Sequence, residues 1–230
     1  MNRPLSFDVD SIVLALGVRG AYLRMTGLTN HATAAEFERI LSQTTDALLA
    51  SLSTESIAND PELRGFRLLH DAVKRSNKKN VASPENLLNI LLQRRLMPRI
   101  NVLVDIYNLV SLESRLALGA HDVDKIAGDV HLRLTNGSET FWPLGSSENK
   151  GVSAGEYAYI DSSNDIICRL EVRQVEKTKV ELHTSDCFYI VQGSSATSST
   201  HLDWTVNRLI SLTHSFCGGT ADVLYRTDQK

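Results

Sequence analysis

The sequence predicts an α+β fold in which helices and strands are segregated along the chain. Apolar residues recur at helical spacing in several segments before residue 115 and again after residue 200. Short segments of alternating apolar and polar residues fill most of the region between them. Segregated helices and strands are typical of α+β domains, whereas a regular alternation of the two would predict a parallel α/β sheet.

The first elements are expected to be a strand and a long helix. Residues 18–27 mix aliphatic, aromatic and Thr residues and end at a glycine, which predicts a strand. Thr33 and Glu36 have the spacing of a capping box, and the apolar residues behind them follow helical spacing. We therefore expect a helix that runs to about Leu52.

Three further helices are predicted before residue 115. Asn59-Asp60-Pro61 indicates one start, because Pro is favoured in the first turn. At Ser83-Pro84-Glu85 we expect Ser to cap the helix and the carboxylate to face the positive end of its dipole. Pro98 ends that helix. Residues 100–114 are apolar around most of a helix, which predicts a central, buried one.

The second half is expected to consist mainly of strands. Residues 130–134 alternate, and Asn136-Gly137 after them predicts a hairpin that continues through residues 139–142. Residues 157–160 and 166–170 flank a polar turn and predict a second hairpin.

A final strand and a closing helix complete the prediction. Residues 187–191 are expected to form another strand, and apolar residues from Leu202 to Phe216 recur on one face of a helix. That helix stops at Cys217-Gly218-Gly219.

Composition limits the class of protein and its surroundings. The chain has 230 residues, 42% apolar and 22% charged, which predicts one soluble domain over residues 1–230. Its longest apolar run, Ile12–Val18, is far shorter than the ~20 residues that span a bilayer. Three scattered cysteines without a Cys-x-x-Cys motif favour a reducing, cytoplasmic location. No metal-ligand or phosphate-loop motif is present, so we expect neither metal nor cofactor.

Positive charge is concentrated in residues 64–99. This segment holds nine Lys and Arg residues against Asp71 and Glu85, a formal charge of +7, which leaves −10 on the rest of the chain. Such a cluster on a mildly acidic protein indicates a local docking surface for a polyanion. The alternative is a solvated helical face followed by a Lys-rich loop.

Asn101, Asp105 and Asn108 form one narrow polar stripe on the apolar helix of residues 100–114. Buried amides and carboxylates need hydrogen-bond partners, and each costs about 1–3 kcal/mol without one. The stripe therefore either ties the helix to a neighbouring loop or lines a polar pocket.

A resemblance to a known family rests on an ordered set of short motifs between residues 60 and 217. The first group is Arg99-Ile100-Asn101, Val104-Asp105, Asn108, Gly119-Ala120-His121-Asp122 and Asp124-Lys125-Ile126-x-Gly128. The second group is Phe141-x-Pro143-Leu144-Gly145, Gly155-Glu156-Tyr157, Cys168-Arg169 and Thr178-Lys179. In this order they resemble the tRNA-editing domain of the phenylalanyl-tRNA synthetase β subunit, and still more its freestanding relatives. Residues 1–60 then read as an N-terminal extension packed on that domain.

The resemblance implies a fold and a function. The fold would be a central, barrel-like mixed sheet flanked by helices. In the synthetase this domain removes tyrosine from wrongly charged tRNA, and freestanding relatives are expected to clear mischarged tRNA in trans or only to bind tRNA. The partner implied is therefore tRNA. The sequence carries no class II synthetase motifs, so it is not expected to be a ligase by itself.

Three departures from the family pattern affect the expected chemistry. Gly119 stands where the family has its editing histidine, while His121 appears two residues later. Arg99 lies one place from the editing arginine. Gln192 occupies the expected position of a family glutamate. Hydrolysis would therefore use a different arrangement or a different amino acid.

The candidate catalytic residues are His121, Asp122 and Gln192. An aminoacyl ester is already activated, so its hydrolysis needs little beyond a positioned water and a stabilised oxyanion. His121 is the expected base, with Asp122 beside it, and Gln192 or Asn101 would orient the water. Asp105 or Asp122 would accept the α-ammonium group. The predicted substrate-binding residues are Asn101, Asp105, Asn108, Gly119 and Ala120. The alternative for His121-Asp122 is a turn that Asp122 caps.

The expected RNA-binding residues lie in two stretches. Residues 169–179 hold four cations, and strand alternation would put Arg169, Glu171 and Arg173 on one face, either toward tRNA phosphates or as a charged edge. The complete set is Lys78, Lys79, Arg94, Arg95, Arg99, Arg169, Arg173, Lys177 and Lys179.

These observations predict a tRNA-binding protein that deacylates mischarged aminoacyl-tRNA. Two alternatives stay open. One is a non-catalytic RNA-binding module that keeps the fold without the pocket chemistry. The other is a binder of a free amino acid or a similar small molecule.

Overall fold

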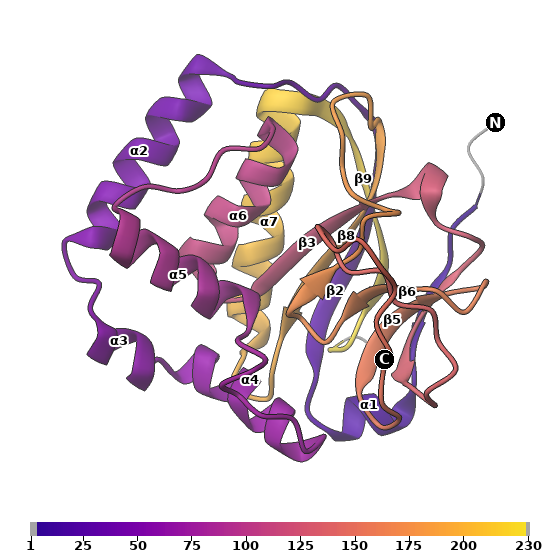
Figure 1. The fold of residues 1–230 in the computed structure, drawn as a ribbon. Helices are drawn as coiled ribbons and strands as arrows, with labels where there is room; N and C mark the ends of the chain where they lie inside the picture. The colour runs from indigo at the N-terminus through magenta and orange to yellow at the C-terminus, as the bar shows by residue number, and fades with distance from the viewer. Residues whose placement is uncertain (1–3, 229–230) are drawn as a thin grey trace.

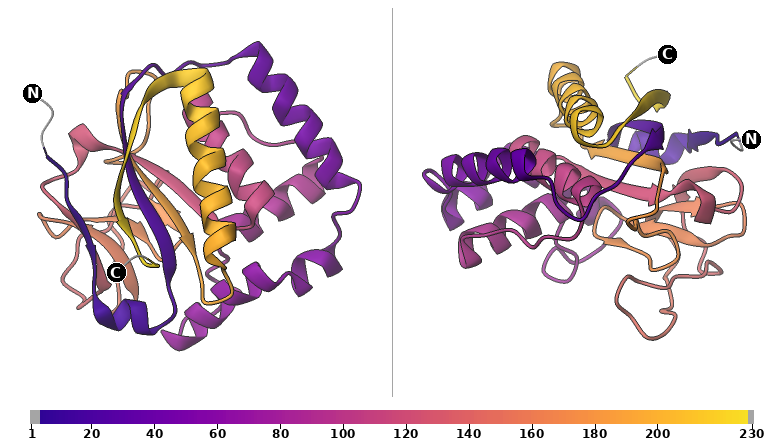
Figure 2. Two further views of the ribbon diagram at one scale, coloured as in Figure 1. Left: turned by 180° about the vertical axis from the view of Figure 1, so that it is seen from behind. Right: turned by 90° about the horizontal axis from the view of Figure 1, so that it is seen from above.

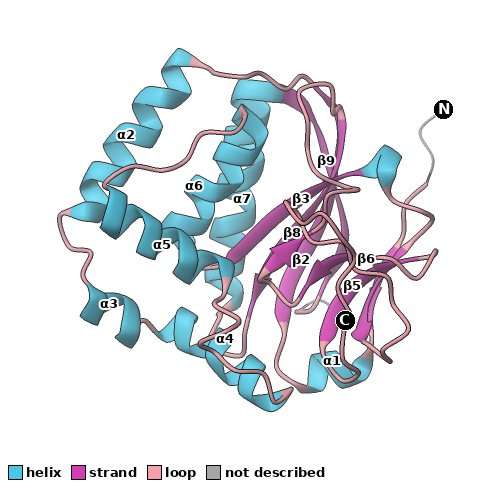
Figure 3. Cartoon of the chain, in the orientation of Figure 1, coloured by secondary structure: helices cyan, strands magenta, loops and turns pink. Residues whose placement is uncertain are grey.

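The computed structural model describes residues 4–228, and it confirms the α+β class. Helices α2 to α6 gather on one side of the molecule and the strands on the other, and α7 lies beside α6 (Figures 1 and 3). The elements are β1 (Phe7–Val9), α1 (Ser11–Ala15), β2 (Arg19–Leu28), α2 (Ala35–Leu49), α3 (Thr54–Asn59), α4 (Pro61–Ala72), α5 (Ser83–Arg94), α6 (Val102–Ser114), β3 (Ala117–Asp122), the 3-10 helix η1 (Val123–Lys125), β4 (Val130–Leu134), β5 (Tyr157–Asp161), β6 (Ile166–Arg169), β7 (Arg173–Gln174), β8 (Asp186–Gly193), α7 (Ser199–Cys217) and β9 (Gly218–Arg226).

One sheet has four antiparallel strands in the order β3-β8-β2-β9. The predicted strand at residues 18–27 is confirmed as β2, and it lies between β8 and β9. The two ends of the chain thus meet in this sheet, as the adjacent indigo and yellow strands show (Figure 2). Because residues 1–60 supply an inner strand, we propose that residues 1–230 fold as a single domain.

The second sheet has five strands in the order β1-β4-β5-β6-β7. β1 pairs with β4 in parallel, and the other pairs are antiparallel. The predicted hairpin of residues 157–160 and 166–170 is confirmed as β5 and β6. Within residues 4–228 the two sheets stay separate, each with open edges, so the barrel-like core implied by the resemblance is in fact a pair of packed sheets.

Aromatic residues from both sheets form the core between them. The Phe7 ring of β1 lies 4.0 Å from the Tyr22 ring of β2 and 5.4 Å from the Phe188 ring of β8, centroid to centroid. Its centroid is 6.1 Å from that of Tyr159 on β5. These contacts lock the short first strand onto both sheets.

Helix α6 is the buried central helix that its apolar sequence predicts. It packs against α7, β3, α5 and α2, and nearly all of its residues are buried. A second apolar cluster, which includes Leu103, Ile106, Val110, Tyr189 and Leu209, joins α6 and α7 to the outer face of the four-stranded sheet.

Two predicted helix starts are shifted by one residue. The N-cap of α2 is Ala34 rather than Thr33, and no side chain caps it. Glu36 then lies too early to close a capping box, and it pairs with Arg39 instead. In α5 the N-cap is Ala82 rather than Ser83, and no side chain caps it. Ser83 is the first helical residue, and its backbone N–H donates to the carbonyl of Glu171 (3.1 Å).

The predicted hairpin at Asn136-Gly137 is wrong. β4 pairs with β5, and residues 139–142 contribute only an isolated bridge at Thr140. The reason is the buried carboxylate of Glu139, which accepts the backbone N–H groups of Asn136 and Gly137 (2.9 Å each) and pairs with Arg133. These bonds turn the chain away from β4.

None of the helices within residues 4–228 has the length and apolar character needed to cross a membrane.

The N-terminal strand should contribute strongly to stability. Replacing Phe7 with Ala removes a buried ring from the inter-sheet core, so we expect the free energy of unfolding to fall by about 3–5 kcal/mol. Ile12→Ala is the matched control: this side chain is 53% exposed and should change stability by at most about 0.5 kcal/mol. Urea unfolding of wild type, Phe7→Ala and Ile12→Ala measures both changes in stability. Equal changes in the two variants would show that residues 1–60 are only loosely attached.

Candidate functional site

A cavity of about 310 Å³ lies where α5, α6, β3, β8 and the turn between β6 and β7 meet. Its walls are mainly apolar, and the exposed side chains of Ile100 and Leu144 stand among them. Polar groups reach it from several elements. They belong to Ser83, Asn86, Asn108, Tyr159, Glu171, Arg173, Gln174 and Gln192. A hollow of this size and mixed character suits a small organic group.

Glu171 is the acidic group that lines this cavity, and it lies in the turn after β6. The predicted strand through residues 169–173 is broken, because Leu170 has a φ of +52° and β6 ends at Arg169. The carboxylate of Glu171 is therefore buried, rather than sharing an exposed face with Arg169 and Arg173. The expected alternation fails at this point, since alternation holds only while the backbone stays extended.

Four side chains hold the Glu171 carboxylate and extend its hydrogen bonds. One oxygen faces His70 Nε2, and the other accepts the Tyr157 hydroxyl and the Gln192 amide (Nε2–Oε2 3.2 Å). Gln192 in turn accepts the Tyr159 hydroxyl through Oε1. Burial raises the pKa of both tyrosines, so each keeps its proton and donates.

His70 of α4 forms a buried ion pair with Glu171. Its second ring nitrogen, Nδ1, lies 3.0 Å from Oδ1 of Asn77, while the Asn77 amide nitrogen donates to Asp71 (2.9 Å). Both ring nitrogens thus face acceptors, which fits the doubly protonated imidazolium. Burial alone would lower the pKa of His70, but the hydrogen bond and charge of Glu171 outweigh it and leave this pKa raised.

Three of the predicted catalytic and substrate-binding residues line the cavity, namely Gln192, Asn108 and Gly119, and the predicted RNA-binding residue Arg173 lines it as well. At Gly119 an added Cβ would lie 2.3 Å from the Gln174 amide nitrogen. The Gln174 side chain therefore crosses the bare backbone of β3 at Gly119, the position where the resemblance implies a histidine.

The other two members of the polar stripe support the rim instead. Asn101 caps α6 by accepting the Val104 backbone N–H (3.1 Å), and its amide donates to the Val180 carbonyl (3.2 Å). Asp105 pairs with Arg99 (Nε–Oδ2 2.9 Å) and accepts the Ile100 backbone N–H (3.1 Å). Burial raises the pKa of Asp105 despite these bonds. The stripe thus divides between the two interpretations, with only Asn108 at the cavity.

His121, Asp122 and Ala120 are buried in β3 outside the cavity lining. His121 Nδ1 lies 2.8 Å from the Thr178 hydroxyl, its ring stacks near Phe188, and within residues 4–228 its Nε2 has no hydrogen-bond partner. Burial lowers the pKa of His121 to about 3. Asp122 accepts the Asp124 backbone N–H (3.1 Å) and the Thr184 hydroxyl (2.8 Å), which is the geometry of a capped turn.

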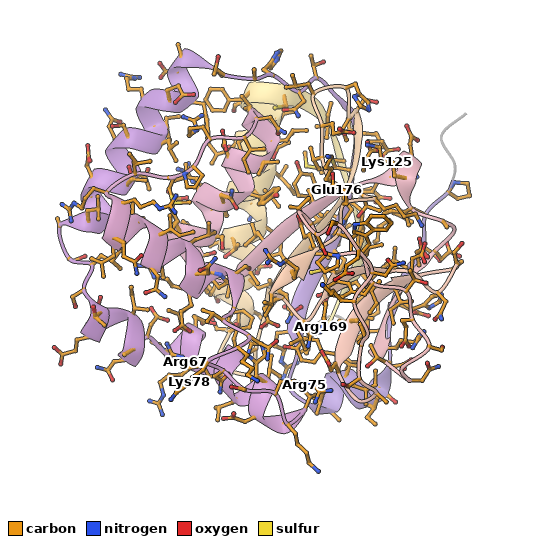
Figure 4. All side chains as sticks on the ribbon, viewed as in Figure 1. Arg67, Arg75, Lys78, Lys125, Arg169 and Glu176 are labelled. Carbon is orange, nitrogen blue, oxygen red and sulfur yellow. The ribbon has the colours of Figure 1, made fainter. Side chains whose placement is uncertain are left out.

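The expected RNA-binding cations fall into two groups. Within residues 4–228, Lys78, Lys79, Arg94, Arg95 and Arg173 are exposed and form no ion pair. The others are paired: Arg99 with Glu38 and Asp105, Arg169 with Glu156, Lys177 with Asp161 and Asp165, and Lys179 with Glu176. Figure 4 shows Arg67, Arg75, Lys78 and Arg169 gathered in its lower part, away from Lys125 and Glu176.

Sequence reasoning missed four residues of the site: Glu171, His70, Tyr157 and Tyr159. The only signal for Glu171 was an acid within a cation-rich stretch, and strand alternation placed it at the surface. His70 lies 101 residues away from its partner along the chain. No local pattern connects residues so far apart.

Comparison with known proteins identifies the family. The family model of the B3/4 domain matches residues 69–212, more than half of the chain. The chain therefore belongs to the B3/4 domain family. No curated protein matches it.

A solved structure supports the relationship. It is an N-terminal fragment of the phenylalanyl-tRNA synthetase β subunit from Pyrococcus horikoshii, with a TM-score of 0.50 and 15% identity over 96% of this chain. The chain spans about half of that fragment, 51%. At this identity the likeness shows a shared fold. Family and fold together confirm a relative of that synthetase domain.

The ion pair of His70 and Glu171 predicts a pH-dependent stability. Since folding raises the pKa of His70, the stabilisation is complete below pH ~6.5 and is lost as pH rises through the folded-state value. We expect the free energy of unfolding, measured in urea, to decrease above pH 6.5. In His70→Gln this decrease should be absent, and the variant should be less stable by about 3–5 kcal/mol because Glu171 loses its partner.

His183→Gln is the control, because His183 is exposed and its loss should leave the pH dependence unchanged. Measurements below pH 6.5 are analysed separately. Burial lowers the pKa of His121 in the folded protein, so the unfolded chain takes up the proton first and the free energy of unfolding falls as the pH falls. An identical slope above pH 6.5 in wild type and His70→Gln would contradict the ion pair.

Proposed function

We propose that the chain binds tRNA and hydrolyses mischarged aminoacyl-tRNA in trans. The observation that carries the proposal is a mainly apolar cavity with a carboxylate and an amide among its lining groups, Glu171 and Gln192. Membership of the B3/4 family supports it, because the solved relative belongs to a tRNA synthetase. The three buried, unpaired cysteines are in keeping with the expected cytoplasmic location.

The size of the cavity supports an aminoacyl group as its occupant. About 310 Å³ suits one amino acid and not a polynucleotide. The body of the tRNA would then lie outside, where the cations Lys78, Lys79, Arg94 and Arg95 are exposed and form no ion pair within residues 4–228. Arg173 is also exposed but lines the cavity, so it would lie between the amino acid and the tRNA body.

The lining groups of the cavity suit the two tasks of ester hydrolysis. The Glu171 carboxylate can accept the α-ammonium group in a charge-assisted hydrogen bond. An amide has two N–H donors and two acceptor sites, and Gln192 uses one of each toward Glu171 and Tyr159. The remaining N–H and lone pair are available to orient a water toward the ester carbonyl. This chemistry relies on position rather than on a titrating base.

His121 and Asp122 remain predicted catalytic residues whose role the pH profile decides. Their location outside the cavity lining favours catalysis by orientation. It also gives weight to the second candidate function, a tRNA-binding module without catalysis, because the family's histidine and glutamate positions hold Gly119 and Gln192. A free amino acid remains the third possible ligand of the same cavity.

A deacylation assay over a panel of mischarged tRNAs tests the proposal. We expect at least one to be hydrolysed. Glu171→Gln should be slower by roughly tenfold or more, because a hydrogen bond to a charged group is lost and because the variant also breaks the pair with His70. The exposed Glu148→Gln is the control and should match wild type. Because His121 is already neutral at pH 6.5, it should contribute no inflection to the rate near that pH.

Other outcomes separate the alternatives. An inflection near pH 6.5 that vanishes in His121→Ala would restore His121 as the base. Tight tRNA binding without any deacylation would establish the non-catalytic module. Binding of a free amino acid without tRNA binding would establish the small-molecule protein.

Binding of tRNA should depend on salt and on the unpaired cations. With several phosphate contacts, affinity measured by filter binding should fall roughly tenfold to a thousandfold from low to physiological salt. Charge reversal at Lys78 and Lys79, or at Arg94 and Arg95, should weaken binding of all tRNAs alike. Reversal at Arg39 and Lys150 changes the net charge equally at exposed positions elsewhere and should have a smaller effect. Equal effects would refute a local docking surface.

A further inference from the structure

A second hollow lies next to the candidate site and has no role in the chemistry described so far. It has a volume of about 290 Å³ and is formed by the loop after β4, the start of β6 and the segment after β7. Its lining residues are Thr140, Trp142, Asn149, Asp165, Ile166, Val175, Glu176 and Lys177. It thus combines one large aromatic ring with several hydrogen-bonding groups.

The indole of Trp142 is exposed and yet fixed in place. Its side chain is 45% exposed, and its ring N–H donates to the Ser146 carbonyl (2.8 Å). On the backbone, the Trp142 carbonyl accepts the Glu176 N–H (3.2 Å), and the Leu144 N–H donates to the Gln174 carbonyl (2.9 Å). A rigid aromatic face open to solvent is a stacking surface for a flat ligand.

The polar groups of the hollow are better suited to accept hydrogen bonds than to bind an anion. Lys177 is held by two carboxylates, Asp161 (2.9 Å) and Asp165 (2.7 Å), so its positive charge is already balanced. Asp165 and Glu176 both line the hollow, and they pair with Lys177 and Lys179 respectively. A phosphate would find no unpaired cation among these lining residues, whereas a neutral ring that carries an amino group would find acceptors.

The two hollows are neighbours along one pair of extended segments. Leu144 and Gln174 line the first cavity, while Trp142 and Glu176 line the second. Trp142 lies two positions from Leu144, and Glu176 lies two positions from Gln174. Two positions correspond to about 7 Å along an extended chain. In an aminoacylated nucleotide the ribose joins the base to the ester, so one nucleotide can place its two ends in adjacent hollows.

We propose that the Trp142 hollow binds the 3′-terminal nucleobase of the RNA, as an amino-bearing base stacked on the indole. The proposal rests on the proposed function, in which the first cavity holds the amino acid attached to the same nucleotide. It assigns base recognition to Trp142, Asp165 and Asn149. Adenine, which ends tRNA, presents the exocyclic amine that Asp165 accepts.

Tryptophan fluorescence tests the stacking directly, because the chain has only two tryptophans. Trp204 is the matched partner, since it is also 45% exposed but lies on α7. In Trp204→Phe, adenosine 5′-monophosphate should quench the remaining Trp142 in a saturable way, and uridine 5′-monophosphate should bind several-fold more weakly. In Trp142→Phe, the remaining Trp204 should show no saturable quenching. No quenching of Trp142, or equal quenching by both nucleotides, would overturn the proposal.

An uncharged oligoribonucleotide ending in cytidine-cytidine-adenosine extends the test to affinity. Trp142→Ala should bind it roughly tenfold to a hundredfold more weakly, the worth of one base stack, and Trp204→Ala should bind it like wild type. Asp165→Asn should reduce the preference for a terminal adenosine over a terminal uridine. Unchanged affinity in Trp142→Ala would overturn the base site.

Failure of the proposed function would look different from failure of this inference. The nucleotide probes carry no amino acid, so base stacking is measured whether or not the protein deacylates tRNA. Conversely, deacylation with a normal kcat/KM in Trp142→Ala would refute the base site and leave the hydrolase intact.

Discussion

The buried ion pair of His70 and Glu171 is the interaction on which the candidate site depends. It joins α4 to the turn after β6, and through Tyr157 and Gln192 it reaches both sheets. A carboxylate in such a place is tolerable only because a cation and two neutral donors compensate for its lost hydration. Removing either partner of the pair would leave the other charge buried and would disturb the lining of the cavity.

The two sheets place this pair because both ends of the chain take part in them. β2 lies between β8 and β9, and the ring of Phe7 packs against both sheets. α6 supports the four-stranded sheet from the other side and supplies Asn108 to the cavity. The candidate site is therefore a product of the whole domain, since its lining residues come from elements spread over more than a hundred positions.

Most cations of the expected RNA-binding set that lie beyond residue 95 serve the fold. Arg99 holds Asp105 at the rim, Arg169 holds the buried Glu156, and Lys177 is balanced by two acids. The positive charge of each paired cation is largely balanced by its acidic partner, so these pairs attract a polyanion weakly. The exposed cations without partners, which include Lys78 and Arg94, are the ones that can still do so.

The sequence by itself determined the fold class, most of the longer helices, several strands and the family resemblance. Helical spacing predicted α2, α6 and α7, and the polar turn between β5 and β6 predicted their hairpin, because these signals are local and repeat with the backbone period. Only the tertiary structure decided the site. The positive φ of Leu170 turned Glu171 inward against the expected alternation, and Glu139 diverted a predicted hairpin. The sequence predicts His121 as a base, yet this side chain is buried, since burial depends on what the rest of the chain packs against it. Contacts between distant residues leave no periodic trace in the sequence, and these contacts define the cavity.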